Sequence, residues 1–340
     1  MTPEAVVLVT GAGGEMGHGL IEALAGRGVR VVAFDLKEPD AAVRAKCRET
    51  VGGDIVRDAD LAPLFERHRF EAVFHLAALL STSGERAPEK AHAVNVQGTL
   101  NLLNLCAASA QRSGEPVKFL FPSTIAVYGL PDLETKARFA RIKEHQYIQP
   151  TTMYGCNKLY CENLGRYFAK HYRRLSADAD RPSVDFRAIR FPGLISAFTV
   201  PSGGTSDYAP EMLHAAAQGR PYACFVAEDR RIPFMAMPDG VDALLRLADA
   251  KAERLTSHVY NIGAFAPSAA EIADRVRAAF PKADVTFAPD LKRQAIVDTW
   301  PADVDDALAR YDFGFTPRYD FERCFDEYLV PNIRRRYGAA

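Results

Sequence analysis

A glycine-rich turn near the N-terminus constrains the fold of this chain more than any other feature. The apolar run "AVVLVT" at 5–10 leads directly into "GAGGEMG", where a helical pattern begins. Gly11, Gly14 and Gly17 would let the backbone turn sharply and approach a pyrophosphate, whose charge would lie at the helix N-terminus. Asp35 ends the next apolar run about twenty residues on, where an acceptor for ribose hydroxyls is expected. The spacing predicts a dinucleotide-binding βαβ unit.

Strand-like and helix-like patterns alternate through the first half of the chain, which is typical of a parallel sheet. The expected strands are 5–10, 30–35, 72–77, 117–123 and 184–190, and the clearest helices are 15–28 and 92–110. Beyond residue 191 the pattern loosens, with Pro and Gly clusters around 192–204. We therefore predict an α/β fold, a Rossmann doubly wound parallel sheet with a smaller C-terminal substrate-binding lobe. The predicted division is 1–190 for the NAD-binding domain and 191–340 for the lobe, with the chain crossing between the two parts.

Composition limits the partners of the protein. Lys plus Arg total 42 and Asp plus Glu total 43, so the net charge of -1 gives no reason to expect nucleic acid or a membrane surface as a partner. The chain shows neither a signal-peptide pattern nor an apolar run of membrane-spanning length, which predicts a cytoplasmic protein. Its six cysteines form no CxxC pair and no zinc-type spacing, so we expect reduced thiols and no metal. Small molecules, or a second copy of the chain, are the expected partners.

The acidic residue after the second strand bears on the choice of cofactor. Asp35 would repel a 2′-phosphate, which favours NAD over NADP, although the neighbouring Lys37 weakens that preference. Asp54 and Ile55 follow the presumed third strand and could reach an adenine, but Asp54 could equally cap its own loop. A turn built for packing alone remains the alternative to a cofactor site, and the surrounding strand, helix and Asp35 argue against it.

A tyrosine and a lysine are placed for proton transfer. Tyr154 and Lys158, in "MYGCNK", are four residues apart on a predicted helix and so lie on one face. A phenol with a pKa near 10 is a poor base at neutral pH, and lowering it by about three units needs roughly 4 kcal/mol. A nearby ammonium and an oxidised nicotinamide would both favour the phenolate. Ser123 and Thr124, at the end of the strand before this helix, could hold the reacting oxygen or only cap a turn.

These motifs together resemble the extended short-chain dehydrogenase/reductase superfamily, over nearly the whole chain. The matching residues are Thr10 to Gly17, "HLAA" at 75–78, Thr124 and the Tyr154/Lys158 pair. The resemblance implies a Rossmann NAD domain, catalysis by Thr124, Tyr154 and Lys158, and a homodimer in which the 90–111 and 154–173 helices form a four-helix interface. The NAD contacts that it implies are Gly11, Gly14, Glu15, Met16, Gly17, Asp35, Asp54, Ile55, Leu76, Ala77, Ala78, Tyr154, Lys158, Pro192 and Leu194.

Three further segments are similar to short-chain-type L-threonine 3-dehydrogenases: 75–85, "RFPGLISAFTVPSGGTSDYA" running into "YACFVAEDRRIPFMAMPD", and "RQAIVDTWPADVDD". The similarity implies NAD-dependent oxidation of the 3-hydroxyl of L-threonine or a related small β-hydroxy acid. The substrate contacts that it implies are Ser81, Thr124, Tyr154, Gly193, Thr205 and Trp300. The turn at Gly203–Gly204 would add backbone N–H groups for a carboxylate.

Two other functions remain open. A nucleotide-sugar 4-epimerase or dehydratase with tightly held NAD would need cations for a diphosphate, which Arg230, Arg231 and Arg293 could supply; as surface charges they need no role. A non-catalytic NAD sensor would not need the intact Thr124, Tyr154 and Lys158 set. Two departures from the threonine dehydrogenase pattern could reshape the pocket: Ala197–Phe198 stands where a Trp is usual, and the 130–150 segment is longer and more basic. His75, flanked by apolar residues, is expected to be a structural histidine.

Overall fold

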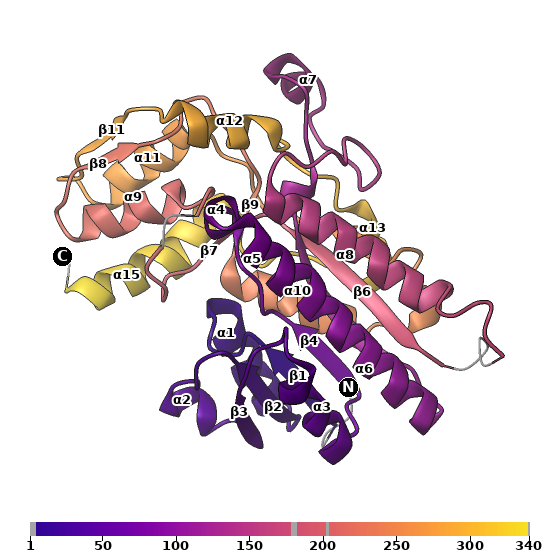
Figure 1. Ribbon diagram of the computed structural model, residues 1–340. Coiled ribbons are helices and arrows are strands. Elements are labelled where there is room, and N and C mark those ends of the chain that lie inside the picture. Colours follow the sequence, from indigo (N-terminus) through magenta and orange to yellow (C-terminus); the bar gives the residue numbers. More distant parts are fainter. Residues whose placement is uncertain (1–4, 178–181, 202–203, 339–340) are drawn as a thin grey trace. The chain divides into compact units, whose positions relative to one another are not determined.

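The computed structural model describes residues 5–177, 182–201 and 204–338 (Figure 1). The strands are β1 (Val6–Thr10), β2 (Arg30–Asp35), β3 (Glu49–Gly52), β4 (Ala72–His75), β5 (Val117–Thr124), β6 (Val184–Phe191), β7 (Gly193–Ile195), β8 (Tyr222–Cys224), β9 (Phe234–Ala236), β10 (Val259–Asn261) and β11 (Val285–Phe287). The helices of the first 170 residues are α1 (Glu15–Gly26), α2 (Ala41–Arg44), α3 (Asp58–Arg67), α4 (Ser81–Arg86), α5 (Pro88–His92), η1 (Ala93–Gln97), α6 (Gly98–Ser113), η2 (Ile125–Val127), α7 (Leu133–Arg138) and α8 (Met153–Lys170). The later helices are α9 (Tyr208–Ala217), α10 (Met237–Asp249), η3 (Ala252–Arg254), α11 (Ala269–Ala279), α12 (Leu291–Thr299), α13 (Ala307–Phe313), α14 (Phe321–Arg323), η4 (Cys324–Leu329) and α15 (Val330–Tyr337).

The central sheet has a doubly wound strand order. Within the described residues, seven strands form one sheet in the order β10-β6-β5-β4-β1-β2-β3. The strands β3, β2, β1, β4 and β5 pair in parallel. Because the chain moves outward from β1 to β3 and then returns to the other side of β1 with β4, the order reverses between β1 and β4. The predicted α/β Rossmann fold is confirmed.

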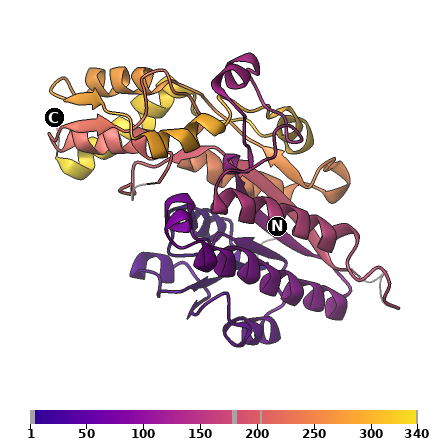
Figure 2. The ribbon, with the colours of Figure 1, turned by 45° about the horizontal axis from the view of Figure 1, so that its top comes forward.

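Helices bury the sheet on both of its faces, which explains the continuous apolar runs of its strands. Val7, Leu8 and Val9, three successive residues of β1, are all fully buried. Figures 1 and 2 both show α6 and α8 side by side, and the Cys161 thiol of α8 donates to the Asn95 carbonyl oxygen at 3.2 Å. Apolar residues of both helices share one core cluster with aromatic rings of β5 and β6, namely Phe119, Phe121 and Phe186.

The chain divides into two compact units, each built from three stretches of sequence. The first unit contains 1–123, 156–189 and 241–260, and the second contains 124–155, 190–240 and 261–340. The second unit includes two small parallel sheets, in which β7 pairs with β9 and β8 pairs with β11. The sequence-based division near residue 190 stays a prediction about domains. In the part of the chain that the structure describes, we find no helix with both the length and the apolar character needed to cross a bilayer.

Candidate active site

The glycine-rich turn after β1 is closely packed at two of its three glycines. Gly11 has a φ of +68°, and a Cβ added there would lie 2.6 Å from the Ala77 nitrogen. A Cβ on Gly17 would lie 2.5 Å from the Ala12 carbonyl oxygen. Both distances are shorter than any real Cβ contact, so only glycine allows this turn to meet the residues after β4 and the start of α1. The structure therefore brings Ala77, a predicted cofactor residue, against the predicted glycine turn.

Asp35 lies at the same turn. Its carboxylate accepts the backbone N–H of Gly13 at 2.9 Å and that of Lys37 at 3.2 Å. Each carboxylate oxygen has two lone pairs, so these bonds leave acceptor capacity for ribose hydroxyls. A tight turn that opens α1, with an acidic side chain fixed beside it, fits an NAD molecule whose pyrophosphate lies at the helix N-terminus. Glu15 and Met16 form the first residues of that helix.

The segment after β3 is held by side chains of its own unit. Asp54 accepts the Val56 N–H at 3.0 Å, so its carboxylate does cap the loop. The Asn101 side chain donates to the carbonyl oxygens of Ile55 at 3.1 Å and Val56 at 2.9 Å. A Cβ on Gly98 would lie 2.5 Å from the Ile55 side chain, which is buried. Ile55 is therefore fixed in position, and its contact with an adenine stays a prediction.

His75, at the end of β4, is a buried neutral histidine. Its Nδ1 lies 2.8 Å from the Thr10 hydroxyl oxygen and its Nε2 lies 2.9 Å from that of Thr99. Burial, with a smaller effect from the positive charge of Lys158, lowers the pKa of His75 to about 3. A ring with both nitrogens engaged and no charge at neutral pH joins β1, β4 and α6, as expected for a structural residue.

Lys158 is buried on α8, beneath the end of β5. Its ammonium donates to the Pro122 carbonyl oxygen at 2.6 Å and lies 4.4 Å from the centre of the Phe121 ring. Burial lowers the pKa of Lys158 to about 8, while Cys161 and Glu162 oppose that shift. Because this pKa is close to neutral pH, the protonation of Lys158 can change with the charge of nearby groups.

Glu162, which was not predicted from the sequence, interacts with both Ser123 and Lys158. Its carboxylate is buried and accepts the Ser123 hydroxyl at 2.5 Å. The available signal was its spacing, because Glu162 follows Lys158 by four residues on the same helix face. Since the Ser123 hydroxyl donates to Glu162, Thr124 is the strand-end hydroxyl that remains a candidate for holding the reacting oxygen.

Thr124 and Tyr154 are hydrogen-bonded through their side chains in the second unit. Thr124 also caps η2, because its Oγ1 accepts the Ala126 N–H at 3.1 Å. Burial raises the pKa of Tyr154 above its ordinary value, and the hydrogen bond from Thr124 opposes that rise. Helix α8 carries Tyr154 in its first turn and Lys158 one turn later. The two predicted hydroxyls are thus in contact, and Tyr154 shares its helix with the predicted lysine.

Three predicted residues of the second unit follow β6. Pro192 is buried, and Gly193 and Leu194 lie in β7. The Gly193 N–H donates to the Pro233 carbonyl oxygen at 3.0 Å, and a Cβ on Gly193 would lie 2.6 Å from the Phe234 ring. Glycine at this position therefore serves the pairing of β7 with β9, and its N–H is not available to a ligand.

The loop before α9 corrects one expectation. The Gly204 N–H donates to the Asp207 carboxylate at 2.6 Å, so this N–H cannot serve as the expected carboxylate donor. Gly203 lies outside the described residues. The carbonyl oxygen of Gly204 accepts from the Arg293 guanidinium at 3.1 Å. Thr205 follows directly and is buried. Of the predicted clamp, the Thr205 side chain remains as the candidate.

Trp300 directly follows the last residue of α12 and is 4% exposed. Its indole Nε1 has no hydrogen-bond partner among the described residues. Leaving such a donor buried and unpaired costs about 1–3 kcal/mol, so this N–H is suited to an oxygen atom of a ligand. Beside it, the Thr299 and Thr151 hydroxyl oxygens lie 3.0 Å apart, which ties the end of α12 to the segment that enters α8. Ser81, by contrast, is buried at the start of α4 in the first unit.

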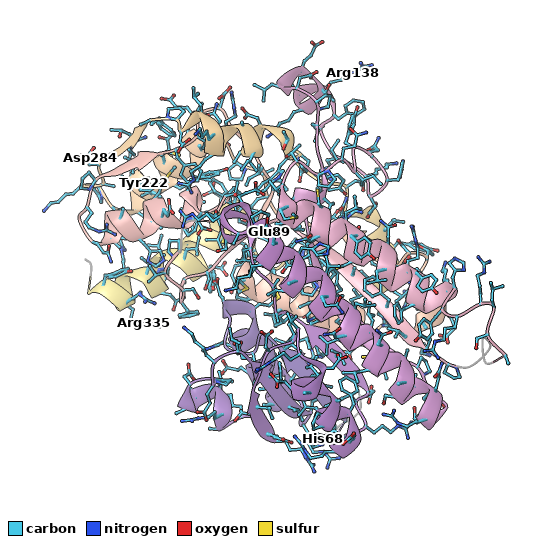
Figure 3. The ribbon with its side chains drawn as sticks, viewed as in Figure 1. His68, Glu89, Arg138, Tyr222, Asp284 and Arg335 are labelled. Atoms are coloured by element: carbon cyan, nitrogen blue, oxygen red, sulfur yellow. The ribbon has the colours of Figure 1, made fainter. Side chains whose placement is uncertain are left out.

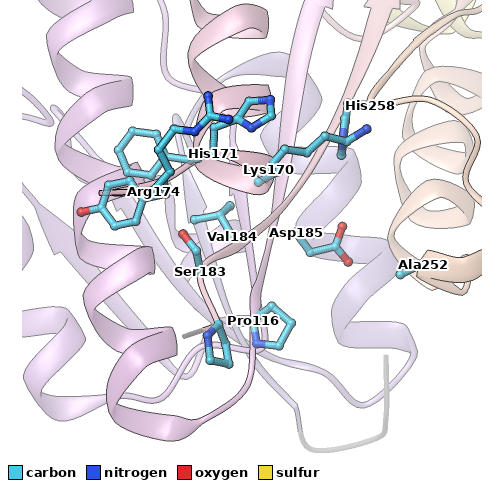
Figure 4. Close-up of a pocket in the computed structure, with 13 residues that line it drawn as sticks. Pro116, Lys170, His171, Arg174, Ser183, Val184, Asp185, Ala252 and His258 are labelled. Carbon is cyan, nitrogen blue, oxygen red and sulfur yellow. The ribbon is translucent and has the colours of Figure 1, made fainter. Parts of the chain in front are cut away.

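A separate cavity of about 580 Å³ lies in the first unit, near the C-terminal end of α8 (Figure 4). Lys170, His171, Arg174 and His258 give it a basic lining beside Asp185. It lies near the amino-terminal ends of β5 and β6, whereas ligands of open α/β sheets bind at the carboxyl ends of the strands. It is therefore distinct from the candidate active site.

Comparison with known proteins identifies the family. A model described as "NAD dependent epimerase/dehydratase family" matches residues 7–263. The chain belongs to this family. It is an NAD-dependent oxidoreductase of the extended short-chain dehydrogenase/reductase type, which agrees with the close-packed glycine turn and Asp35 described above.

Relatives within the family carry a more specific name. The mitochondrial L-threonine 3-dehydrogenase of Bos taurus is 33% identical over 318 residues, which cover 93% of this chain and 79% of the relative. A GalE-like L-threonine dehydrogenase from Cupriavidus necator, solved in a holo form, is 33% identical with a TM-score of 0.82, covering 97% of this chain and 99% of its own. A monomeric L-threonine 3-dehydrogenase from a metagenome is 35% identical with a TM-score of 0.84, covering 97% and 99%.

Proposed function

We propose that this enzyme oxidises the 3-hydroxyl of L-threonine, or of a related small β-hydroxy acid, with NAD. The observation that carries the proposal is the side-chain hydrogen bond between Thr124, at the end of β5, and Tyr154, which shares α8 with the buried Lys158. The chain is similar over nearly its full length to proteins named L-threonine 3-dehydrogenase, and this similarity supports threonine as the proposed substrate.

In the proposed reaction Thr124 orients the substrate hydroxyl and Tyr154 accepts its proton. Burial disfavours the tyrosinate, so positive charge must offset that cost. In the proposal Lys158, on the same helix as Tyr154, supplies such charge, and NAD, when bound, accepts the hydride. For L-threonine the immediate product would be 2-amino-3-ketobutyrate.

In the proposal, polar groups of the C-terminal lobe bind the amino-acid end of the substrate. The Thr205 hydroxyl and the unpaired Nε1 of Trp300 are both on buried side chains suited to a small polar substrate. Ser81 and Gly193 complete the set carried over from the family resemblance, with Gly193 contributing backbone shape rather than its N–H. Pro192 and Leu194 are proposed to line the nicotinamide.

A nucleotide-sugar 4-epimerase or dehydratase is the second candidate, and the paired arginines disfavour it. Arg230 forms ion pairs with Asp229 and Asp298, both at 2.6 Å. Arg231 pairs with Glu271 at 2.8 Å. Arg293 donates to Gly204 and lies over the Phe225 ring at 3.3 Å. A diphosphate would have to displace these partners before any of the three cations could bind it.

We further propose a cytoplasmic homodimer formed through α6 and α8. All six cysteines lie within the described residues and none is in a disulfide, which suits a reducing compartment. Light scattering at micromolar concentration tests the dimer, and a mass of one chain would overturn it. Fractionation of cells that express the protein tests the compartment, and recovery outside the cytoplasm would overturn that part.

Two assays run in parallel test the proposed reaction. Purified protein is mixed with NAD and L-threonine while NADH absorbance is followed, and UDP-glucose is monitored in parallel for its epimer. Tyr154→Phe should abolish NADH formation while NAD affinity stays nearly unchanged, whereas Tyr311→Phe, at an exposed tyrosine of α13, should behave as wild type. No NADH from threonine or other small hydroxy acids, together with conversion of the sugar, would replace this proposal with the epimerase.

A further inference from the structure

The 130–150 segment is bonded to the chain around Trp300. The Leu130 N–H donates to the Thr299 carbonyl oxygen at 2.8 Å. Farther along, Ile142 pairs with Val304 as a parallel bridge, and Arg141 donates to the Asp303 carboxylate at 3.0 Å. Both stretches belong to the second unit. The 130–150 segment, one of the two departures from the threonine dehydrogenase pattern, is therefore attached on both sides of the single tryptophan.

Lys136 is the one residue of α7 that is buried. Its ammonium donates to the Val297 carbonyl oxygen at 2.9 Å, and only 6% of the residue is exposed. Arg138, two residues later, is exposed, and Figure 3 shows it at the outer end of α7. A lysine is almost never fully buried unless its charge is paired.

The charges around Lys136 alternate in sign. Asp298 and Asp229 favour its ammonium, and Arg230 disfavours it. Arg230 in turn pairs with both of those carboxylates. The group thus joins α7, the loop before β9 and the end of α12. The two carboxylates in this group offset the cost of burying the charged Lys136 ammonium.

Lys136 stabilises the C-terminal end of α12. Val297 is in the last turn of that helix, and its carbonyl oxygen also accepts the backbone N–H of Trp300 at 3.2 Å. A cation there also interacts favourably with the negative end of the helix dipole. Trp300 follows the last helical residue, so the orientation of its ring depends on how this end is held.

We propose that Lys136 is a positioning residue that fixes the end of α12 and so sets the place of Trp300 against the substrate. The inference rests on the proposed function for its effect on substrate binding, but the contact between α7 and α12 can be tested without any reaction. The proposal gives the 130–150 segment a function, which is to hold Trp300 rigidly beside the substrate.

The fluorescence of the protein reports this contact directly, because Trp300 is the only tryptophan in the sequence. Lys136→Met keeps the length of the side chain and removes its donor and charge. We expect its emission to move to longer wavelength and its quenching by acrylamide to rise about twofold, as the ring gains exposure and mobility. Lys143→Met, an exposed lysine of the same segment, is the matched control and should match wild type. Equal emission and quenching in Lys136→Met and wild type would overturn the proposal.

The pH dependence of wild-type emission provides a test that does not depend on folding of the variant. Burial, and to a lesser extent Arg230, lower the pKa of Lys136 to about 8, against the opposing effects of Asp298 and Asp229. Emission should therefore change as the pH rises from 7 to 9, and Lys136→Met should lose that step. A wild-type emission that stays constant over this range would count against the proposal.

Steady-state kinetics then separate this inference from the proposed function. Lys136→Met should raise KM for L-threonine about tenfold, which corresponds to about 1.4 kcal/mol, with kcat and KM for NAD within twofold of wild type. A fluorescence change with no threonine activity in wild type would retain the positioning contact and reject the proposed substrate. A fluorescence change with an unchanged KM would reject the role of Trp300's position in binding.

Discussion

Gly17→Ala should weaken NAD binding through one methyl group. The added Cβ would lie 2.5 Å from the Ala12 carbonyl oxygen and 2.8 Å from that of Gly11, whereas ordinary contacts begin at 3.4 Å. The turn must therefore move by about 0.9 Å, the difference between 3.4 and 2.5 Å. Both obstructing atoms belong to the backbone, so no side-chain rotation relieves the clash.

A displacement of this size has a cost that can be bounded. Overpacking a closely packed position costs about 1–3 kcal/mol. If that cost is expressed when the turn binds the pyrophosphate, the dissociation constant for NAD rises about 5- to 150-fold. Gly26→Ala is the matched control, because it lies at the end of the same helix and a Cβ there meets nothing within 4 Å. That substitution should leave NAD binding unchanged and gain up to about 1 kcal/mol of stability from helix propensity.

Calorimetric titration of each purified variant with NAD measures the effect, and thermal unfolding without NAD confirms that both are folded. A folded Gly17→Ala variant with a dissociation constant within twofold of wild type would refute the reasoning. Such a result would mean that the turn relaxes without cost, and that its close packing does not hold the cofactor.

Three further substitutions test the electrostatics of the site and its surroundings. Glu162→Gln removes a charge that raises the pKa of Lys158, so that pKa should fall below about 8 and the alkaline loss of kcat should move to lower pH; an unchanged pH profile would exclude the coupling. His75→Gln should reduce the acid sensitivity of stability: because the folded pKa is lowered to about 3 from 6.5, the unfolded state binds more protons, and wild-type stability falls as the pH drops from about 6.5 toward 3. Urea unfolding at pH 7 and pH 5 should show a smaller difference for the variant than for wild type. Thr205→Ala should raise KM for L-threonine about tenfold with little effect on NAD; equal KM values would remove Thr205 from the substrate site.

The fold was predictable because its signals are local. The glycine turn, the alternating apolar runs and the Tyr154/Lys158 spacing each depend on residues close in sequence. The structure confirmed the α/β class, but β4 ends at His75, two residues before the predicted strand end at 77. Strand ends at a ligand edge are hard to locate, because the residues after β4 continue apolar while their backbone packs against Gly11.

The polar contacts of the site were less predictable because they join distant residues. Nothing near Gly204 in sequence indicates that Arg293, 89 residues away, would donate to its carbonyl oxygen. Glu162 and Lys136 were not singled out from the sequence, because only the structure shows that these helix charges are buried. The sequence could identify which side chains have useful chemistry, but not which of them the fold had already engaged.

That distinction bears on the choice between an amino acid and a nucleotide sugar. From the sequence alone, a diphosphate would be favoured by three arginines, Arg230, Arg231 and Arg293. A phosphate ligand needs cations that are free to form charged hydrogen bonds. In the structure each guanidinium already has a carboxylate or carbonyl partner. Removing one partner from a buried charge pair costs about 3–5 kcal/mol, and Arg230 is only 15% exposed. A diphosphate would have to recover that cost before gaining affinity, whereas a small amino acid can use the Thr205 hydroxyl and the unpaired Trp300 N–H without breaking any of these pairs.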